Sequence, residues 1–193
     1  DENALRIVCD AVSDADTLVS LTNHSYFNLN GGGSVLGHTL RVSADRFTEN
    51  DRHSLPTGRL LPVSGTPFDF REPRPLGRDI GADDIQLRFG SGYDHNYVLS
   101  DGAAPARLKK AAVLYAAESG IGMTVLTTQP GMQLYTGNHL TPRKGKNGVI
   151  IDRQGRHVEG GGIGIRCRKH AVCRRRDKIR YGFAACGLPG FFD

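Results

Sequence analysis

The sequence has no tryptophan and no long apolar run, and these absences limit what the protein can be. No stretch approaches the roughly 20 consecutive apolar residues that a membrane-spanning helix needs, and no charged leader followed by an apolar run opens the chain. We therefore expect a soluble, cytoplasmic protein that does not interact with membranes. Runs with helical period are also scarce, which argues against a helical bundle.

Cysteine is scarce as well, with four residues in 193. Their number and uneven spacing do not fit a disulfide framework, so we expect free thiols in a reducing compartment. Cys167, His170 and Cys173 lie within seven residues, but a structural zinc site needs four ligands at regular spacing, and only Cys186 or His157 could supply the fourth. We expect neither a metal nor a cofactor.

An excess of positive charge is confined to the end of the chain. Residues 1–148 contain 15 Lys and Arg against 16 Asp and Glu, whereas residues 149–193 contain 10 against 4. The basic run RCRKHAVCRRRDKIR could bind a polyanion by charge alone, but it has no interleaved aromatic residues and matches no nucleic-acid-binding module. We expect it to be solvated, and we expect no nucleic-acid partner.

Short segments of alternating polarity recur between turn signals, which is typical of antiparallel β-structure. In HTLRVSADRF, Leu40 and Val42 would face a core while Thr39, Arg41 and Ser43 face the other way. The sequence predicts seven strands of this kind: LRIVCDAV, TLVSLTNHSY, HTLRVSADRF, YDHNYVLS, RLKKAAVLYAA, IGMTVLTTQ and MQLYTG. A tight turn at Glu118, Ser119 and Gly120 would join the fifth of these to the sixth in a hairpin.

Two parts of the chain depart from this pattern. Residues 50–92 are rich in proline and glycine and predict a long connection of the kind that is often functional. Residues 149–193 have a glycine run, an arginine triplet and no sustained period, so we expect them to be poorly ordered. The sequence thus predicts a β-domain over 1–148 and a divergent basic tail over 149–193.

Four clusters at strand ends carry the side chains that could do chemistry: His24 in TNHSYFN, Asp94 and His95 in GYDHNY, Gln133 in QPGMQLYTGN, and the loop GTPFDFR. By itself each has an ordinary structural explanation, such as a turn cap for Asp94 or a sheet-surface amide for Gln133. Their side chains could nevertheless converge at one end of a sheet.

Taken together, the blocks LTNHSYFNLNG, LLPVSGTPFDFR, GYDHNYVL, LTTQPGMQLYTGN and GKNG resemble the aldose 1-epimerase, or galactose mutarotase, family. The resemblance covers about residues 5–148. It implies an antiparallel β-sandwich of the galactose mutarotase type, of which this chain would be the incomplete latter part.

The resemblance also implies roles for particular residues. His24 would be the acid that protonates the ring oxygen of the sugar, a role that suits a side chain titrating near neutral pH. Asp94 and Gln133 would bind sugar hydroxyls. Asn23 and Asn28 would be framework amides, Tyr26 and Phe27 packing residues, and His95, Tyr135 and Asn138 supports.

Two departures from the family's pattern bear on activity. The family's glutamate base follows the GKNG block, but the only glutamate after Gly148 is Glu159, which matches no family block. The family's upstream histidine and arginine have no counterpart here either. The resemblance therefore implies an aldose 1-epimerase that interconverts α and β anomers of aldohexoses such as galactose and glucose, with impaired activity, or a non-catalytic carbohydrate-binding relic of the same fold.

The missing strands of such a sandwich would leave edges and apolar surface exposed. We expect a monomer that binds a small-molecule sugar, although exposed edges also favour pairing with other chains.

Overall fold

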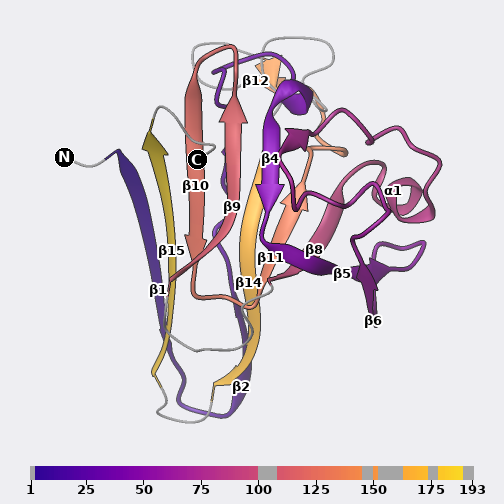
Figure 1. Ribbon diagram of the computed structural model, residues 1–193. Coiled ribbons are helices and arrows are strands. Elements are labelled where there is room, and N and C mark those ends of the chain that lie inside the picture. Colours follow the sequence, from indigo (N-terminus) through magenta and orange to yellow (C-terminus); the bar gives the residue numbers. More distant parts are fainter. Residues whose placement is uncertain (1–2, 100–107, 145–149, 152–162, 174–177, 189–193) are drawn as a thin grey trace.

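The computed structural model describes residues 3–99, 108–144, 150–151, 163–173 and 178–188, which form two antiparallel sheets (Figure 1). The described strands of the first sheet follow the order β1 (Ala4–Val12), β15 (Lys178–Leu188), β10 (Ile121–Thr127), β9 (Lys109–Ala116), β4 (Thr39–Val42) and β7 (Arg74–Pro75). Those of the second follow the order β2 (Thr17–Leu21), β14 (Ile163–Cys173), β11 (Gly131–Tyr135), β8 (Asp94–Leu99), β5 (Ala44–Asn50) and β6 (Pro56–Pro62).

Shorter elements complete the described part of the chain. Strand β3 (Tyr26–Phe27) pairs with β14, and β12 (Arg143–Lys144) pairs with β13 (Ile150–Ile151). A 3₁₀ turn, η1, covers Val35–Gly37, and one short helix, α1, covers Ile85–Gly90. Within the described residues no helix has the length and apolar character needed to cross a membrane. The predicted antiparallel β-sandwich is confirmed.

The core lies between the two sheets and follows the alternation predicted from the sequence. In β4, Leu40 and Val42 are fully buried while Arg41 is exposed, as expected. Aromatic side chains fill the layer between the sheets: Phe47 stacks on Phe68 with ring centroids 4.2 Å apart, and the Tyr97 hydroxyl donates to the Phe68 carbonyl at 3.0 Å.

The predicted strand HTLRVSADRF is in fact two strands that belong to different sheets. Ser43 alone separates β4 in the first sheet from β5 in the second, and its N–H donates to the Ala111 carbonyl of β9 at 2.9 Å. The chain therefore passes directly from one layer to the other. The predicted hairpin between β9 and β10 is confirmed, with Gly120 in its turn at φ +69°.

The proline-rich segment 50–92 contains more regular structure than predicted, namely β6, β7 and α1. Asp84 caps α1 by accepting hydrogen bonds from the N–H groups of Gln86 and Leu87. Arg74 fastens the middle of the segment, because its guanidinium donates to the Pro67 carbonyl at 2.9 Å, pairs with Asp79 at 3.1 Å and lies over the Phe70 ring.

The tail differs from the sequence prediction over two segments. Residues 163–173 and 178–188 form the long strands β14 and β15 rather than disordered chain. Each lies inside its sheet, with β15 between β1 and β10 and β14 between β2 and β11, so ladder pairing on both sides orders a backbone that its own composition does not. Residues 152–162, 174–177 and 189–193 lie outside the described residues.

Core packing makes a testable prediction. Leu40→Ala removes a fully buried side chain from β4 and should lower the free energy of unfolding by about 2–5 kcal/mol. Leu55→Ala makes the same chemical change where the side chain is 61% exposed, and should change it by less than about 0.5 kcal/mol. Urea unfolding followed by circular dichroism measures both, and equal losses would contradict the described core.

Candidate functional site

Asp94 and Gln133, two of the predicted site residues, are in direct contact. The Gln133 side-chain amide donates to a carboxylate oxygen of Asp94 at 2.7 Å. The contact follows from the pairing of β8 with β11, which sets Asp94 opposite Tyr135 and Asn96 opposite Gln133. Both side chains are half-buried and lie on the face of the second sheet that points away from the core.

His24 is connected to this pair through two tyrosines. It lies in the loop between β2 and β3, where its side chain is exposed and its ring contacts that of Tyr26 at 5.2 Å between centroids. Tyr26 in turn contacts Tyr135, edge to face, at 6.1 Å. Tyr135 lies opposite Asp94, so the contacts form a continuous series from His24 to Asp94.

A glycine in β14 makes the contact between the tyrosines possible. Gly164 pairs with Tyr26 on one side and with Tyr135 on the other, which places Tyr26, Gly164, Tyr135 and Asp94 in one row across four strands. Strands separated by one neighbour are about 10 Å apart, a distance that two tyrosine rings can bridge only when no side chain stands between them. Asp94 is part of this row, and His24 and Gln133 each lie two residues from one of its tyrosines, so the three predicted site residues lie near the same end of one sheet.

The backbone of Asp94 is fixed independently of its side chain. Its carbonyl accepts a hydrogen bond from the buried Asn50 amide at 3.1 Å, and its N–H donates to Nδ1 of His95 at 3.2 Å. Asn50 is itself held by Gln86 of α1 through hydrogen bonds of 2.8 and 2.9 Å. The carboxylate is therefore presented from a preorganised position.

Asn138 fixes the corner that precedes Asp94. Its buried amide donates to the carbonyls of Gly90 and Tyr93 at 2.8 and 2.9 Å and accepts from the Thr136 hydroxyl at 2.7 Å. Gly92 lies between Gly90 and Tyr93 in the chain and has φ +131°. A Cβ at this position would lie 2.5 Å from the Asn138 side-chain oxygen. Only glycine fits this corner, which supports the predicted structural role of Asn138.

His95 faces the core, on the side of β8 opposite to Asp94. Its ring is fully buried and lies edge-on to Phe68 at 4.6 Å and to Phe47 at 5.7 Å. Burial lowers the pKa of His95 to about 4, so the ring is neutral at physiological pH. Because Nδ1 accepts from the Asp94 N–H, Nε2 carries the hydrogen, and this contact fits the supporting role expected of His95.

The loop after His24 is held by amides and by a second buried histidine. The Asn23 side chain accepts from the Ser25 N–H at 3.1 Å, and the Asn28 amide donates to the carbonyls of Gly32 and Gly33 at 3.0 and 2.9 Å. The buried His38 accepts from the Leu29 N–H at 3.0 Å, and burial lowers its pKa. These bonds fit the framework roles expected of the two asparagines.

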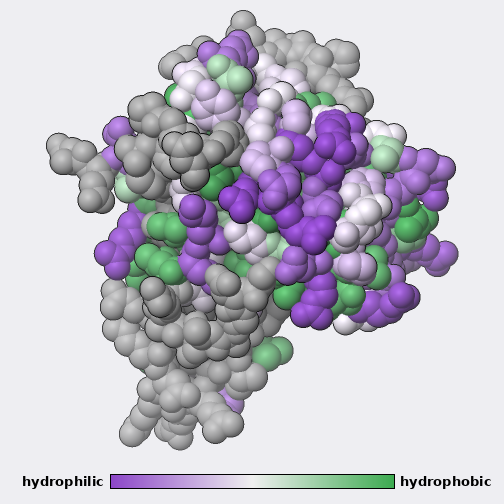
Figure 2. Space-filling model, viewed as in Figure 1, coloured by the Kyte–Doolittle hydropathy of each residue, from purple (hydrophilic) through white to green (hydrophobic). Residues whose placement is uncertain are grey.

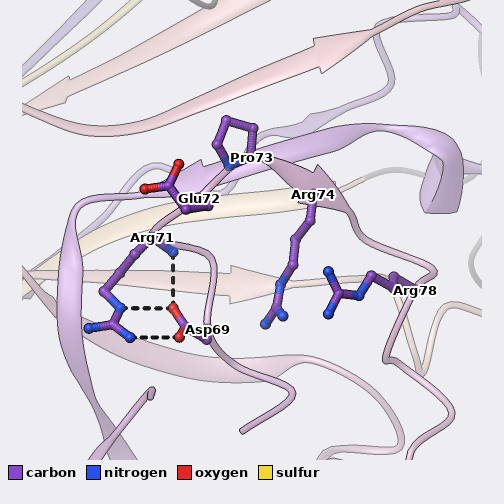
Figure 3. A pocket seen from close by; sticks show the side chains of 6 residues that line it. All are labelled: Asp69, Arg71, Glu72, Pro73, Arg74 and Arg78. Atoms are coloured by element: carbon purple, nitrogen blue, oxygen red, sulfur yellow. Dashed lines mark hydrogen bonds and ion pairs between the residues drawn. The ribbon is translucent and has the colours of Figure 1, made fainter. Parts of the chain in front are cut away.

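The GTPFDFR loop does not join the site. Phe68 and Phe70 enter the core, while Asp69 and Arg71 line a separate cavity of about 370 Å³ together with Glu72, Pro73, Arg74 and Arg78 (Figure 3). Its arginines are already paired, Arg71 with Asp69 at 2.7 Å and both Arg74 and Arg78 with Asp79. This cavity therefore has little net charge to offer a ligand, and the loop serves mainly to pack the core.

Among the described side chains, no group of three or more His, Cys, Asp and Glu could hold a metal ion. The side chains of Cys167, His170 and Cys173, and residue Glu159, lie outside the described part of the structure.

Comparison with known proteins identifies the family and the fold. The family model described as aldose 1-epimerase matches residues 1–169. The chain belongs to the aldose 1-epimerase family. Galactose mutarotase of Rattus norvegicus is 41% identical over 146 residues, and aldose 1-epimerase of Escherichia coli K12 is 38% identical over 162 residues.

The solved structures agree with this assignment. An aldose epimerase homologue from C. elegans superposes with a TM-score of 0.80 at 26% identity, over 97% of this chain and 56% of that one. Galactose 1-epimerase from Lactobacillus acidophilus superposes with a TM-score of 0.78, over 98% of this chain and 54% of that one. The sandwich is therefore of the galactose mutarotase type, as predicted.

The chain spans only part of the length of these relatives. The matches cover 74% of this chain but 40% of the rat protein, and 82% of this chain but 46% of the bacterial one. It thus spans less than half the length of these curated relatives.

Sequence reasoning missed the Asn50–Gln86 pair, which links β5 to α1 and supports Asp94. The two residues are 36 positions apart, and neither lies in a recognisable motif. Only the folded arrangement reveals the contact.

The corner at Gly92 makes a prediction that tests the support of Asp94. Gly92→Ala would place a methyl group against Asn138 in a backbone conformation that side chains rarely adopt, and should cost about 2–4 kcal/mol of stability. Gly120→Ala, at φ +69° with open space around it, should cost about 1 kcal/mol. Denaturant unfolding of both variants checks the difference, and a Gly92 variant no weaker than the Gly120 variant would refute the role of this corner.

The buried His95 predicts how stability depends on pH. Its folded-state pKa lies below the unfolded value of 6.5, so between pH 6.5 and about 4 the unfolded chain binds a proton that the folded chain does not. The free energy of unfolding should therefore fall as pH decreases through this window, by about 3 kcal/mol over its full width.

Urea unfolding at pH 7 and pH 5 measures this fall, and His95→Gln should reduce it. Part of the fall should remain in the variant, because burial also lowers the pKa of His38. An unchanged pH dependence in His95→Gln would show that His95 does not resist protonation in the folded state.

Proposed function

We propose that this chain binds aldohexoses such as galactose and glucose on the outward face of the second sheet and catalyses anomer exchange there at a reduced rate. The observation that carries the proposal is the Asp94–Gln133 hydrogen bond, connected through Tyr135 and Tyr26 to His24. A carboxylate and an amide side by side offer acceptors and a donor that suit the adjacent hydroxyls of a neutral sugar. Family membership supports the same substrate class.

Anomer exchange requires a proton to leave the anomeric hydroxyl and another to reach the ring oxygen, after which the open aldehyde turns and closes on either face. In the proposal the His24 imidazolium gives its proton to the ring oxygen and takes it back on closure, while solvent water accepts the proton of the anomeric hydroxyl and returns it. Its exposed position in the loop between β2 and β3 lets a sugar approach it. Asp94 and Gln133 hold the hydroxyls, and Asn50, His95 and Asn138 keep Asp94 in place.

We expect the reduced rate because this mechanism has no general base from the protein to take the proton of the anomeric hydroxyl. The family's C-terminal glutamate block has no match in the sequence, and one general acid or base contributes about 10²–10⁴ to the rate. The alternative proposal is a carbohydrate-binding relic that has lost catalysis. His24, Asp94 and Gln133 would bind the sugar in this alternative too, and the missing glutamate base favours it over the catalytic proposal.

Polarimetry tests the catalytic proposal. Fresh α-galactose should approach its equilibrium rotation faster with the protein than in buffer at the same pH, by a margin about 10²–10⁴ below that of a full-length relative. His24→Ala should abolish the excess rate. His53→Ala removes an exposed histidine of the segment 50–92 and should retain it.

Binding separates the two functions. Galactose should give saturation-transfer NMR signals with the wild-type chain, and these should weaken in Gln133→Ala because Asp94 loses its neighbouring donor. Binding without any excess rate would select the relic. If the chain neither binds galactose nor increases the rate, both proposals are contradicted.

A further inference from the structure

Asn96 is a polar side chain on the outward face of the second sheet that the proposed mechanism does not use. It lies two residues after Asp94 on β8, is half-buried like Asp94, and stands directly opposite Gln133 of β11. Residues two apart on a strand share a face and lie about 7 Å apart. Polarity alone would not single Asn96 out, because hydrophilic residues also cover the side of the molecule where α1, β5 and β6 lie (Figure 2). Its fixed orientation is what distinguishes it.

The Asn96 amide is held from β5, the neighbour of β8 on the side away from β11. Its nitrogen donates to the Thr48 hydroxyl at 3.0 Å, and Thr48 follows Phe47, which pairs with Tyr97. A carboxamide carries its donor and its acceptor on opposite sides, so a nitrogen turned toward β5 turns the oxygen toward β11. β11 is the strand that carries Gln133.

Position 131 of β11 gives that oxygen its space. A Cβ on Gly131 would lie 2.4 Å from Oδ1 of Asn96, well inside contact distance. The backbone at this position does not itself need glycine, because its φ is not in the positive range that side chains avoid. The missing side chain at position 131 therefore serves the placement of the Asn96 oxygen.

We propose that Asn96 is a specificity-determining residue, whose side-chain oxygen accepts a hydrogen bond from a sugar hydroxyl remote from the ring oxygen. This inference rests on the proposed function and adds a residue to the same site. Strands β3, β14, β11 and β8 are successive neighbours, so β8 lies about 14 Å from β3. A hexose whose ring oxygen meets His24, next to β3, extends toward β8 with its hydroxyls on C2, C3 and C4.

Asp94 and Asn96 bind different hydroxyls in this arrangement. Asp94 lies opposite Tyr135, two residues after Gln133. The Asn96 oxygen lies beside Gly131, two residues before Gln133. The two acceptors are too far apart to share one hydroxyl, and they suit two hydroxyls of the same ring. A sugar without the hydroxyl that Asn96 binds leaves a half-buried acceptor unpaired, which is how a polar site rejects such an analogue.

Deoxy sugars test this role. NMR titration gives dissociation constants for galactose and for the derivatives that lack the hydroxyl on C2, C3 or C4. The wild-type chain should bind at least one derivative about 3- to 10-fold more weakly than galactose, and Asn96→Ala should bind that derivative and galactose equally. Asn96→Asp keeps an oxygen acceptor and should keep the preference. The derivative without the C6 hydroxyl is the control sugar, because C6 is attached beside the ring oxygen, and its affinity relative to galactose should not change in Asn96→Ala.

Gly131→Ala tests the placement of the oxygen while leaving Asn96 in the chain. The added methyl group must displace Oδ1, so this variant should lose the same preference as Asn96→Ala. Gly37→Ala is the matched control, because it adds the same methyl group where no atom lies within 4 Å, and it should keep the preference. Circular dichroism confirms that each variant folds.

The outcomes separate this inference from the proposed function. If the wild-type chain does not bind galactose, the sugar site and the role of Asn96 are both contradicted. If it binds galactose but treats the deoxy sugars alike, or if Asn96→Ala keeps the wild-type preference, only the role of Asn96 is contradicted. A preference that is lost in Asn96→Ala but kept in Gly131→Ala would show that the oxygen is not where the structure places it.

Discussion

The alternation of side chains along β8 is the constraint on which both the core and the candidate site depend. His95, Tyr97 and Leu99 point into the sandwich, which commits Asp94 and Asn96 to the opposite face. A shift of one residue in its pairing with β11 would exchange the two sets and bury a carboxylate among aromatic rings. The buried aromatic layer thus determines where the acidic side chain lies, and the ladder to β11 determines that an amide meets it.

The supports of Asp94 come from parts of the chain that are distant in sequence. Asn50 reaches it from β5, Asn138 reaches the preceding corner from beyond β11, and His95 contacts it from the next position. Each of these side chains is buried, and an unmade hydrogen bond there would cost about 1–3 kcal/mol. This cost favours one arrangement of the corner and so gives the carboxylate a fixed position without a rigid helix beneath it.

The strands that sequence reasoning predicted well are those whose own pattern determines burial. Leu40 and Val42 alternate with polar residues, and glycine at position 120 marks a turn that needs a positive φ. The pattern could not show that Ser43 divides one apparent strand between two sheets, because both halves alternate in the same way. It also missed β14 and β15, since their order depends on pairing with strands on both sides, which their own composition does not reveal.

The candidate site, like the fold, could be predicted from the sequence only in part. Family blocks named His24, Asp94 and Gln133, and the pairing of β8 with β11 accounts for the contact between the last two. The contribution of Gly164 could not be predicted, because its importance lies in what it leaves empty between Tyr26 and Tyr135. The link between Asn50 and Gln86 is likewise visible only after folding.

The single residue between β4 and β5 has a mechanical consequence for the second sheet. Successive Cα atoms are 3.8 Å apart, so a one-residue passage leaves almost no slack between the layers. The two sheets cannot slide past one another at this point without breaking the bond from Ser43 to Ala111. Shear between the layers is therefore restricted next to β5.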